Sequence, residues 1–154
     1  MILEFEDLDD QEVELLLKAP ILVSILIAGA DNEIDKTEIR EAVNISKFRQ
    51  IKARKVLIEY YKEVGQDFED KLKILLSGYP VEADKRNPMI VSELEKLNDI
   101  LPKIDKPFTV ELYASLKDIA KKIAEASGGI LGYMSVGYEE SKYMDLKMIK
   151  DPSK

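Results

Sequence analysis

Four carboxylates lie within eight residues, directly after the longest apolar run of the chain. The run extends from Ala19 to Ala30, and the carboxylates belong to Asp31, Glu33, Asp35 and Glu38. Carboxylate oxygens are the ligands that calcium and magnesium prefer in proteins. The segment 28–38, which we call the acidic corner, is therefore a candidate site for a divalent cation, calcium or magnesium. No other cofactor is expected.

The same acids also fit a structural role at a junction between two helices. Asn32 is of a residue type that tolerates the left-handed conformation in which helices often end. Asp35 and Glu38 have the spacing of a capping box that opens the next helix. Asp31 would face the negative end of the preceding helix dipole, which is unfavourable without a compensating partner. These residues are therefore compatible with two roles, as helix caps and as ligands of a cation.

The standard calcium loop of EF-hand proteins is excluded at the acidic corner. Asp31, Glu33 and Asp35 occupy the first, third and fifth positions of such a loop. However, Lys36 stands where the loop needs glycine for its turn, and Ala42 stands where a bidentate glutamate must bind the ion. A cation site would have to borrow acids from elsewhere in the chain.

The acidic corner resembles the signature of the TerB-like family, the small all-helical proteins linked to tellurite resistance. The matching residues are Ala28-Gly29-Ala30-Asp31-Asn32-Glu33-Ile34-Asp35-Lys36-Thr37-Glu38, with Asn32 in place of the usual glycine. The resemblance implies an all-α fold: one compact bundle of about seven to eight helices over residues 1–154, with a weak internal pseudo-repeat. It also implies the divalent-cation role that has been proposed for this family.

A weaker second copy of the signature occurs at Ala124-Glu125-Ala126-Ser127-Gly128-Gly129-Ile130, with Gly137 and Glu140 at the cap and capping-box positions. It departs from the pattern at Ser127, where aspartate is expected, and it carries the extra residues 131–136. If the two corners lie close together, Glu125, Glu139 and Glu140 would face the first corner. The predicted metal ligands are then Asp31, Glu33, Asp35, Glu38, Glu125 and Glu140.

Residue types argue against catalysis. The chain contains no Cys and no His, so it lacks thiol nucleophiles, thiolate zinc sites and the commonest general base. It has no Walker phosphate loop, no Gly-x-Ser-x-Gly and no Ser-x-x-Lys motif. We therefore expect a non-enzymatic protein. A small enzyme that uses paired carboxylates is the alternative, because burial can separate the pKa values of two acids.

Charge is distributed unevenly along the chain. The net charge is −7, but residues 1–14 hold seven acids and no base, so the other 140 residues balance. Residues 1–9 form an acidic N-terminal arm, and Asp9 and Glu12 have the spacing of a capping box. The opposite block, 42–58, has no acid and carries Lys47, Arg49, Lys52, Arg54 and Lys55. It could receive an anion, be a solvated helix face, or pair with the acidic arm of the same or a neighbouring chain.

A second surface for partners is predicted after the glycines at 128–132. These glycines follow a helix, so they indicate a helix end rather than a phosphate cradle. Tyr133, Met134 and Tyr138 could then present adaptable apolar contacts. With the basic block, they are the predicted partner-binding residues for a protein partner or self-association. Nucleic-acid binding is not expected, because the chain is acidic and its basic cluster is short.

Helical periodicity and punctuation are found throughout, and no strand is predicted. Helices are expected at about 10–18, from Pro20 to the acidic corner, from 36, over 56–64 and over 68–76. Residues 81–87 are expected to form a polar linker, followed by a helix that Asn87 and Pro88 open. Helices over 110–128 and 138–149 and a short tail, 151–154, complete the expected order.

The expected location is the cytoplasm. The N-terminus lacks the basic and apolar parts of a signal peptide, and the longest apolar run is too short to cross a bilayer. No transmembrane segment is expected, while a peripheral complex at a membrane stays open. Taken together, these features favour a stress-related or tellurite-related binding module. A protein-interaction scaffold without metal is the first alternative.

Overall fold

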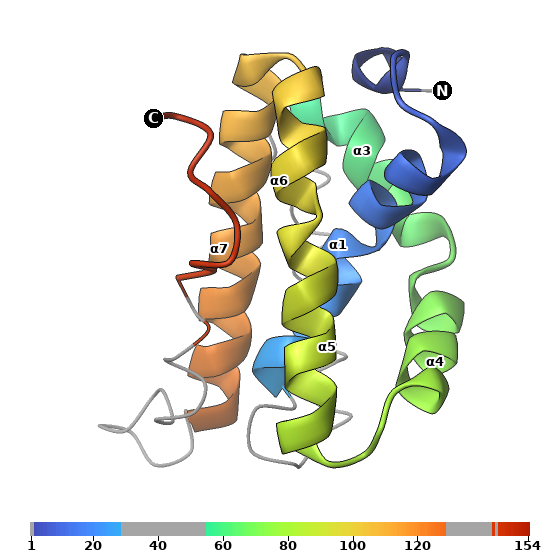
Figure 1. Ribbon diagram of the computed structural model, residues 1–154, viewed down its shortest axis with the longest axis vertical. Helices are drawn as coiled ribbons and strands as arrows, with labels where there is room; N and C mark the ends of the chain where they lie inside the picture. The colour runs from blue at the N-terminus through green and yellow to red at the C-terminus, as the bar shows by residue number, and fades with distance from the viewer. Residues whose placement is uncertain (1, 29–54, 129–142, 144) are drawn as a thin grey trace.

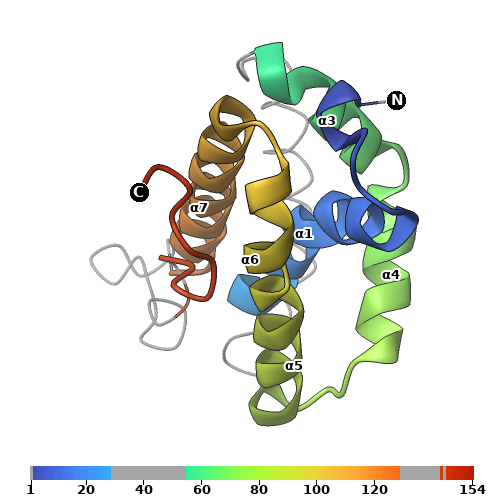
Figure 2. The same ribbon diagram turned by 45° about the horizontal axis from the view of Figure 1, so that its top comes forward.

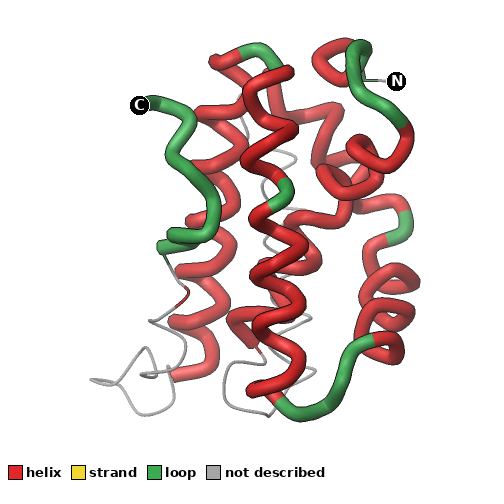
Figure 3. The backbone as a smooth tube through the Cα atoms, viewed as in Figure 1, coloured by secondary structure: helices red, strands yellow, loops and turns green. Residues whose placement is uncertain are grey.

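The computed structural model describes residues 2–28, 55–128, 143 and 145–154. These residues form helices and the turns between them, and none of them belongs to a strand (Figure 3). The all-α prediction is confirmed for this part of the chain. The acidic corner after Ala28, the predicted helix from 36, and the segment 129–142 lie outside the described residues.

Within the described segment 55–128, successive helices are joined by short connections (Figure 1). In order they are η1 (Leu3–Phe5), α1 (Asp10–Ala28), α3 (Lys55–Gln66), α4 (Phe68–Gly78), α5 (Ala83–Glu95), α6 (Leu97–Ile100), η2 (Leu101–Lys103) and α7 (Lys106–Gly128). The predicted breaks near Gly65 and at Gly78 are found within one residue of their expected positions. Among the described residues, no helix combines the length and apolar composition needed to cross a membrane.

Helix α1 lies at the centre of the fold. Every residue from Ala19 to Ala28 is buried, so this part of the helix has no solvent-facing side. A helix that is apolar all round must be surrounded by other elements. Accordingly, α1 contacts α3, α4, α5, α6 and α7, and Figure 2 shows it between α4 and α7. The buried side chains of all these helices form one continuous core.

Pro20 lies inside α1, so the prediction of two separate helices was wrong. Proline has no N–H to donate to the carbonyl four residues earlier, which here is that of Leu16. The hydroxyl of Tyr60 in α3 donates to the Leu16 oxygen instead, at 2.6 Å, and the contact is buried. Burial also holds the pKa of the Tyr60 hydroxyl well above its ordinary value, so it stays a donor. A tertiary hydrogen bond therefore replaces the one that Pro20 removes.

Aromatic side chains connect the N-terminal arm to the core. Phe5 of η1 contacts Tyr60 and Phe108 edge to face, with ring centroids 6.2 and 5.5 Å apart. Next to this cluster, the Tyr61 and Ser115 hydroxyls are 2.5 Å apart, linking α3 to α7. The edge-to-face ring contacts of Phe5 add to the stabilisation that burial alone provides. The arm is acidic in sequence, but its Phe5 packs inside the core.

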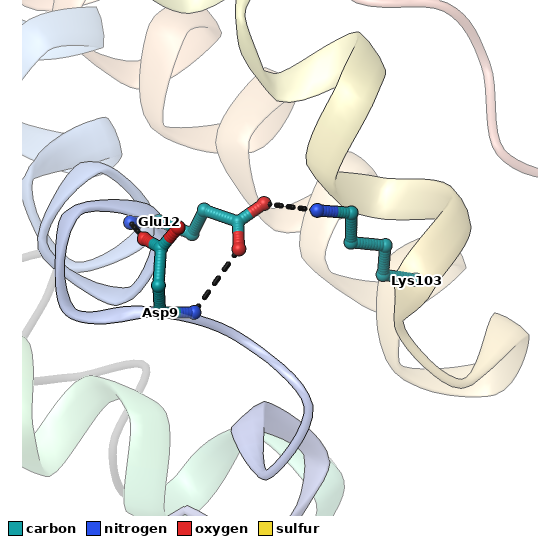
Figure 4. A network of polar contacts seen from close by, with 3 residues as sticks. All are labelled: Asp9, Glu12 and Lys103. Carbon is teal, nitrogen blue, oxygen red and sulfur yellow. Dashed lines mark hydrogen bonds and ion pairs between the residues drawn. The ribbon is translucent and has the colours of Figure 1, made fainter.

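The predicted capping box at the start of α1 is confirmed. The Asp9 carboxylate accepts a hydrogen bond from the Glu12 N–H at 2.8 Å, and Glu12 accepts one from the Asp9 N–H at 3.0 Å (Figure 4). The other Glu12 oxygen is 2.7 Å from the Lys103 ammonium of η2. This bond lowers the pKa of the Glu12 carboxyl, with a further contribution from the Asp9 N–H. The cap therefore also attaches α1 to η2.

Helix α5 begins earlier than predicted. It starts at Ala83, so the expected polar linker 81–87 is mostly helical and Asn87 does not open the helix. Asn87 is buried inside α5 instead, and its Oδ1 accepts no hydrogen bond within the described part of the chain. The carbonyl that loses its partner to Pro88 belongs to Asp84, an exposed residue, where water can satisfy it. Burial and solvation override the local cap signal here.

The predicted helix over 138–149 was wrong for residues 145–149, while residues 138–142 and 144 lie outside the described part of the chain. Residues 145–150 lie in turns and bends, and Leu146 has a φ of 48°, in the left-handed region. Leu146 and Ile149 are both buried in the core. We call residues 145–154 the C-terminal strap, which runs beside α7 (Figure 1). A right-handed helix cannot continue through Leu146, because its φ has the sign opposite to that of helical residues.

Candidate functional site

The predicted site residues fall almost entirely outside the described part of the chain. This applies to the predicted metal ligands Asp31, Glu33, Asp35, Glu38 and Glu140, and to the predicted partner residues Lys47, Arg49, Lys52, Arg54, Tyr133, Met134 and Tyr138. Glu125 lies near the end of α7, and Lys55 is the first residue of α3, each placed by its backbone alone. Their functional roles stay predictions.

The structure does place the two helices that lead to the two corners. Helix α1 ends at Ala28 and α7 reaches Gly128, and these two helices pack against one another. Both end on the same side of the molecule, as the light-blue and dark-orange ribbon ends show (Figures 1 and 2). We call this side the corner end. The residues that follow Ala28 and Gly128 therefore start from the same side.

Apolar packing fixes the corner end. The last turn of α1, from Ile25 to Ala28, is buried on every side. On α7 the buried residues in this region are Ile119, Ala120, Ile123 and Ala124. Within residues 2–28, 55–128, 143 and 145–154, no three acidic side chains are grouped closely enough to hold a metal ion.

A pocket lies where α7 begins, far along that helix from the corner end. Its volume is about 400 Å³, and we call it the lysine pocket. It is lined by Asn98, Leu101, Pro102, Ile104, Lys106, Thr109, Lys150, Asp151, Pro152 and Lys154. The first six residues come from α6, η2, the connection after η2 and the start of α7, and the other four come from the C-terminal strap. Sequence reasoning missed this pocket, because its three lysines form no local cluster.

Asn98 holds the two walls of the lysine pocket together. Its Nδ2 donates to the carbonyl of Met148 at 2.9 Å, and its Oδ1 accepts from the N–H of Lys150 at 2.8 Å. One side chain thus satisfies two backbone groups on either side of Ile149, whose own side chain is buried. The strap is therefore fixed by both polar and apolar contacts, and the pocket has a defined shape.

The acid in the lysine pocket is already engaged. The carboxylate of Asp151 accepts hydrogen bonds from the Ser153 hydroxyl at 2.6 Å and from the Ser153 N–H at 2.9 Å. These bonds lower the pKa of Asp151, so it is ionised at neutral pH. The Thr109 hydroxyl donates to the carbonyl of Lys106 at 3.0 Å, within the first turn of α7. The ammonium groups of Lys106, Lys150 and Lys154 remain as the groups able to attract a ligand.

No family model, no curated protein and no solved structure matches this chain.

Proposed function

We propose that this chain is a non-enzymatic, TerB-like binding module that binds calcium or magnesium at the corner end. In this proposal the complete fold is a bundle of about seven to eight helices with a weak pseudo-repeat. The module acts in the cytoplasm, in a stress-related or tellurite-related complex, through contacts with a protein partner. The observation that supports the cation site is the packing of α1 against α7, with both helices ending on one side.

Chain geometry limits how far the first acids can lie from the corner end. Successive Cα atoms are about 3.8 Å apart, so three residues span at most about 11 Å. Asp31 is three residues beyond Ala28, and Glu125 belongs to α7 itself. Asp31 and Glu125, one acid from each corner, are therefore tethered to the same side of the molecule. This closeness is what a site shared between the two corners needs.

The chemistry of the donors favours a hard cation. The proposed ligands are all carboxylates, and the chain offers no imidazole or thiolate to attract zinc or copper. If the proposed acids gather near the ends of α1 and α7, they repel one another, and those closest to the helix ends, such as Asp31 and Glu125, face the negative ends of the helix dipoles. A divalent cation would offset both effects. Calcium or magnesium would bind through several of these oxygens, with water completing the coordination.

Partner binding is assigned to the basic block and to the apolar residues after α7. The basic block offers Lys47, Arg49, Lys52, Arg54 and Lys55, and the other surface offers Tyr133, Met134 and Tyr138. Tyrosine, methionine and arginine are enriched where proteins meet. A scaffold without metal would use the same surfaces, so metal dependence is the property that separates the two proposals.

Thermal unfolding with millimolar calcium, magnesium or manganese tests the cation site. A ligand at about one hundred times its dissociation constant stabilises the folded state by roughly 2.7 kcal/mol, which raises the midpoint by several degrees. We expect such a shift for the native chain and none for Asp31→Asn/Glu33→Gln. A matched control is Glu59→Gln/Asp70→Asn, which removes two exposed acids of α3 and α4. This control should shift like the native chain.

The opposite results are equally informative. An absence of any shift with all three cations, or an equal shift in Asp31→Asn/Glu33→Gln, would refute the cation site and favour the scaffold without metal. A shift lost equally in the control would indicate a general charge effect rather than a site.

A further inference from the structure

The lysine pocket has the features of a site that is formed before any ligand arrives. Two chain segments about forty residues apart in sequence, 98–109 and 150–154, face each other across it. The double hydrogen bond of Asn98 and the buried Ile149 fix their separation. Its volume of about 400 Å³ is in the range of small-molecule sites. The pocket is therefore preorganised for a ligand.

The charge of the pocket is opposite to that of the chain. Its lining includes three lysines and one aspartate, while the whole chain carries a net charge of −7. Asp151 directs its carboxylate to Ser153, through two hydrogen bonds. No carboxylate is in ion-pair contact with Lys106, Lys150 or Lys154 within the described part of the chain. The pocket is thus a local region of positive charge.

One of the pocket lysines, Lys106, has the charge that its position in α7 disfavours. Lys106 is the first residue of a 23-residue helix, whose N-terminus carries the positive end of the helix dipole. Asp105, just before it, is of the favoured sign, but it does not line the pocket. The lysines add positive charge where the dipole favours negative charge. An anion in the pocket would be attracted by the lysines and by the helix N-terminus together.

The apolar lining adds a second requirement for the ligand. Leu101, Pro102, Ile104 and Pro152 form the walls beside the lysines. These side chains give an inorganic ion no favourable contact, but they can cover a small carbon skeleton. The pocket also contains no arginine, the residue that best matches the planar fork of a carboxylate. Lysine binds phosphate as a point charge, and several lysines can share one dianion.

We infer that the lysine pocket binds a small organic phosphate. The phosphate group lies between Lys106 and Lys150, at the first turn of α7, and the compact organic body packs against Pro102, Ile104 and Pro152. Lys154 contributes further positive charge from the strap. This site is independent of the proposed cation site, because the two lie at opposite ends of α7.

Phenyl phosphate is a suitable probe, because it joins a phosphate to a compact apolar ring. Its binding to the full chain can be followed by titration calorimetry, with inorganic phosphate and phenol as matched half-ligands. We expect saturable binding of one phenyl phosphate, weaker binding of inorganic phosphate and no binding of phenol. No saturable binding of phenyl phosphate, or equal affinity for either half-ligand, would overturn the inference.

Two charge-matched variants locate the binding. Lys106→Gln/Lys150→Gln removes two ammonium groups from the pocket, and we expect phenyl phosphate affinity to fall about tenfold or more. Lys121→Gln/Lys147→Gln removes two exposed lysines that do not line the pocket, from α7 and the strap. This control should keep its affinity within about twofold. Equal losses in the two variants would contradict a site at the pocket.

All four lysines are exposed, so neither variant should unfold the chain, and circular dichroism verifies this. If Lys106→Gln/Lys150→Gln is nevertheless unfolded, Lys154→Gln alone provides the same comparison with a smaller expected loss. An unchanged affinity in Lys154→Gln, together with an unfolded double variant, would also count against the inference.

Discussion

The two ends of α7 carry residues of opposite charge, and each end includes one charge that the helix dipole disfavours: Lys106 at the start and Glu125 near the end. Lysines of the lysine pocket surround the start of α7, where the dipole is positive. In the sequence, carboxylates follow α1 within a few residues, and Glu125 lies in the last turn of α7, where the dipole is negative. The start of α1 is different, since Asp9, Asp10 and Glu12 there have the favoured sign. Comparing the start of α1 with the two ends of α7 therefore distinguishes charges that stabilise a helix from charges that could bind a ligand.

Hydrogen bonding supports the same distinction. At the start of α1 the carboxylates of Asp9 and Glu12 bind each other's backbone N–H groups, and Glu12 also binds Lys103. Every charge in this cap has a local partner. In the lysine pocket, by contrast, the acid is hydrogen-bonded to Ser153, and none of the three lysines is in ion-pair contact with an acid in the described part of the chain. A stability role accounts for the first region and not for the second.

The largest effect is expected for Tyr60→Phe, which tests the continuity of α1 on which the corner end depends. Removing the hydroxyl leaves the buried Leu16 carbonyl without the donor that replaces the missing N–H of Pro20. An unsatisfied buried carbonyl costs about 1–3 kcal/mol. Urea unfolding should show a loss of that size in the free energy of unfolding.

Two further variants make this prediction specific. Tyr113→Phe removes a partly exposed hydroxyl with a longer bond of 3.3 Å to Asp145, and it should cost less than Tyr60→Phe. Pro20→Ala restores an N–H for the Leu16 carbonyl, so Tyr60→Phe should cost less in that background. Equal costs in both backgrounds would show that the hydroxyl does not compensate for Pro20.

An intermediate effect is expected for Asn98→Ala, which breaks the joint between the two walls of the lysine pocket. The variant loses two hydrogen bonds to the strap, worth about 1–2 kcal/mol in total. Hydrogen exchange of the Lys150 amide should accelerate, because its acceptor is removed, and phenyl phosphate should bind more weakly. Asn98→Asp keeps an acceptor for Lys150 but loses the donor to Met148, so its exchange rate should be intermediate. Unchanged exchange in Asn98→Ala would mean that the strap is held by its apolar contacts alone.

The smallest effect is a pH dependence at the start of α1. The folded chain lowers the pKa of Glu12 below its ordinary value of 4.5, chiefly through the bond to Lys103. A lowered pKa means that the folded state favours the charged form. The stabilisation is therefore complete above pH 4.5 and is lost as the pH falls through the lower folded value. Urea unfolding between neutral pH and pH 3 should show a smaller loss for Lys103→Gln than for the native chain. If the free energy of unfolding falls with pH by the same amount in Lys103→Gln and in the native chain, the bond to Lys103 is not the cause of the pH dependence.

Local sequence patterns predicted the parts of this fold that depend on near neighbours. Asp9 and Glu12 are three residues apart, and their capping box was expected from spacing alone. The break at Gly78 was equally local. Pro20 could not be interpreted in this way, because its compensation comes from Tyr60, 44 residues after Leu16. The strap likewise depends on Asn98, about fifty residues away, so its periodicity wrongly predicted a helix.

The candidate sites show the same division. The acidic corner was recognised because its four carboxylates lie within eight residues of sequence, and its role stays a prediction since it lies outside the described residues. The lysine pocket could not be found in advance. Lys106 and Lys150 are distant in sequence, and only the fold of the strap brings them to one cavity.

The central claim is that the two corners contribute to one cation site, and a calorimetric double-mutant cycle tests it most directly. Magnesium and calcium would be titrated into the native chain, Asp31→Asn, Glu125→Gln and the combined variant. We predict that each single change weakens binding and that the combined loss differs clearly from the sum, because ligands of one ion act together. Native affinity in both single variants, or no binding to the native chain at millimolar cation, would contradict the account.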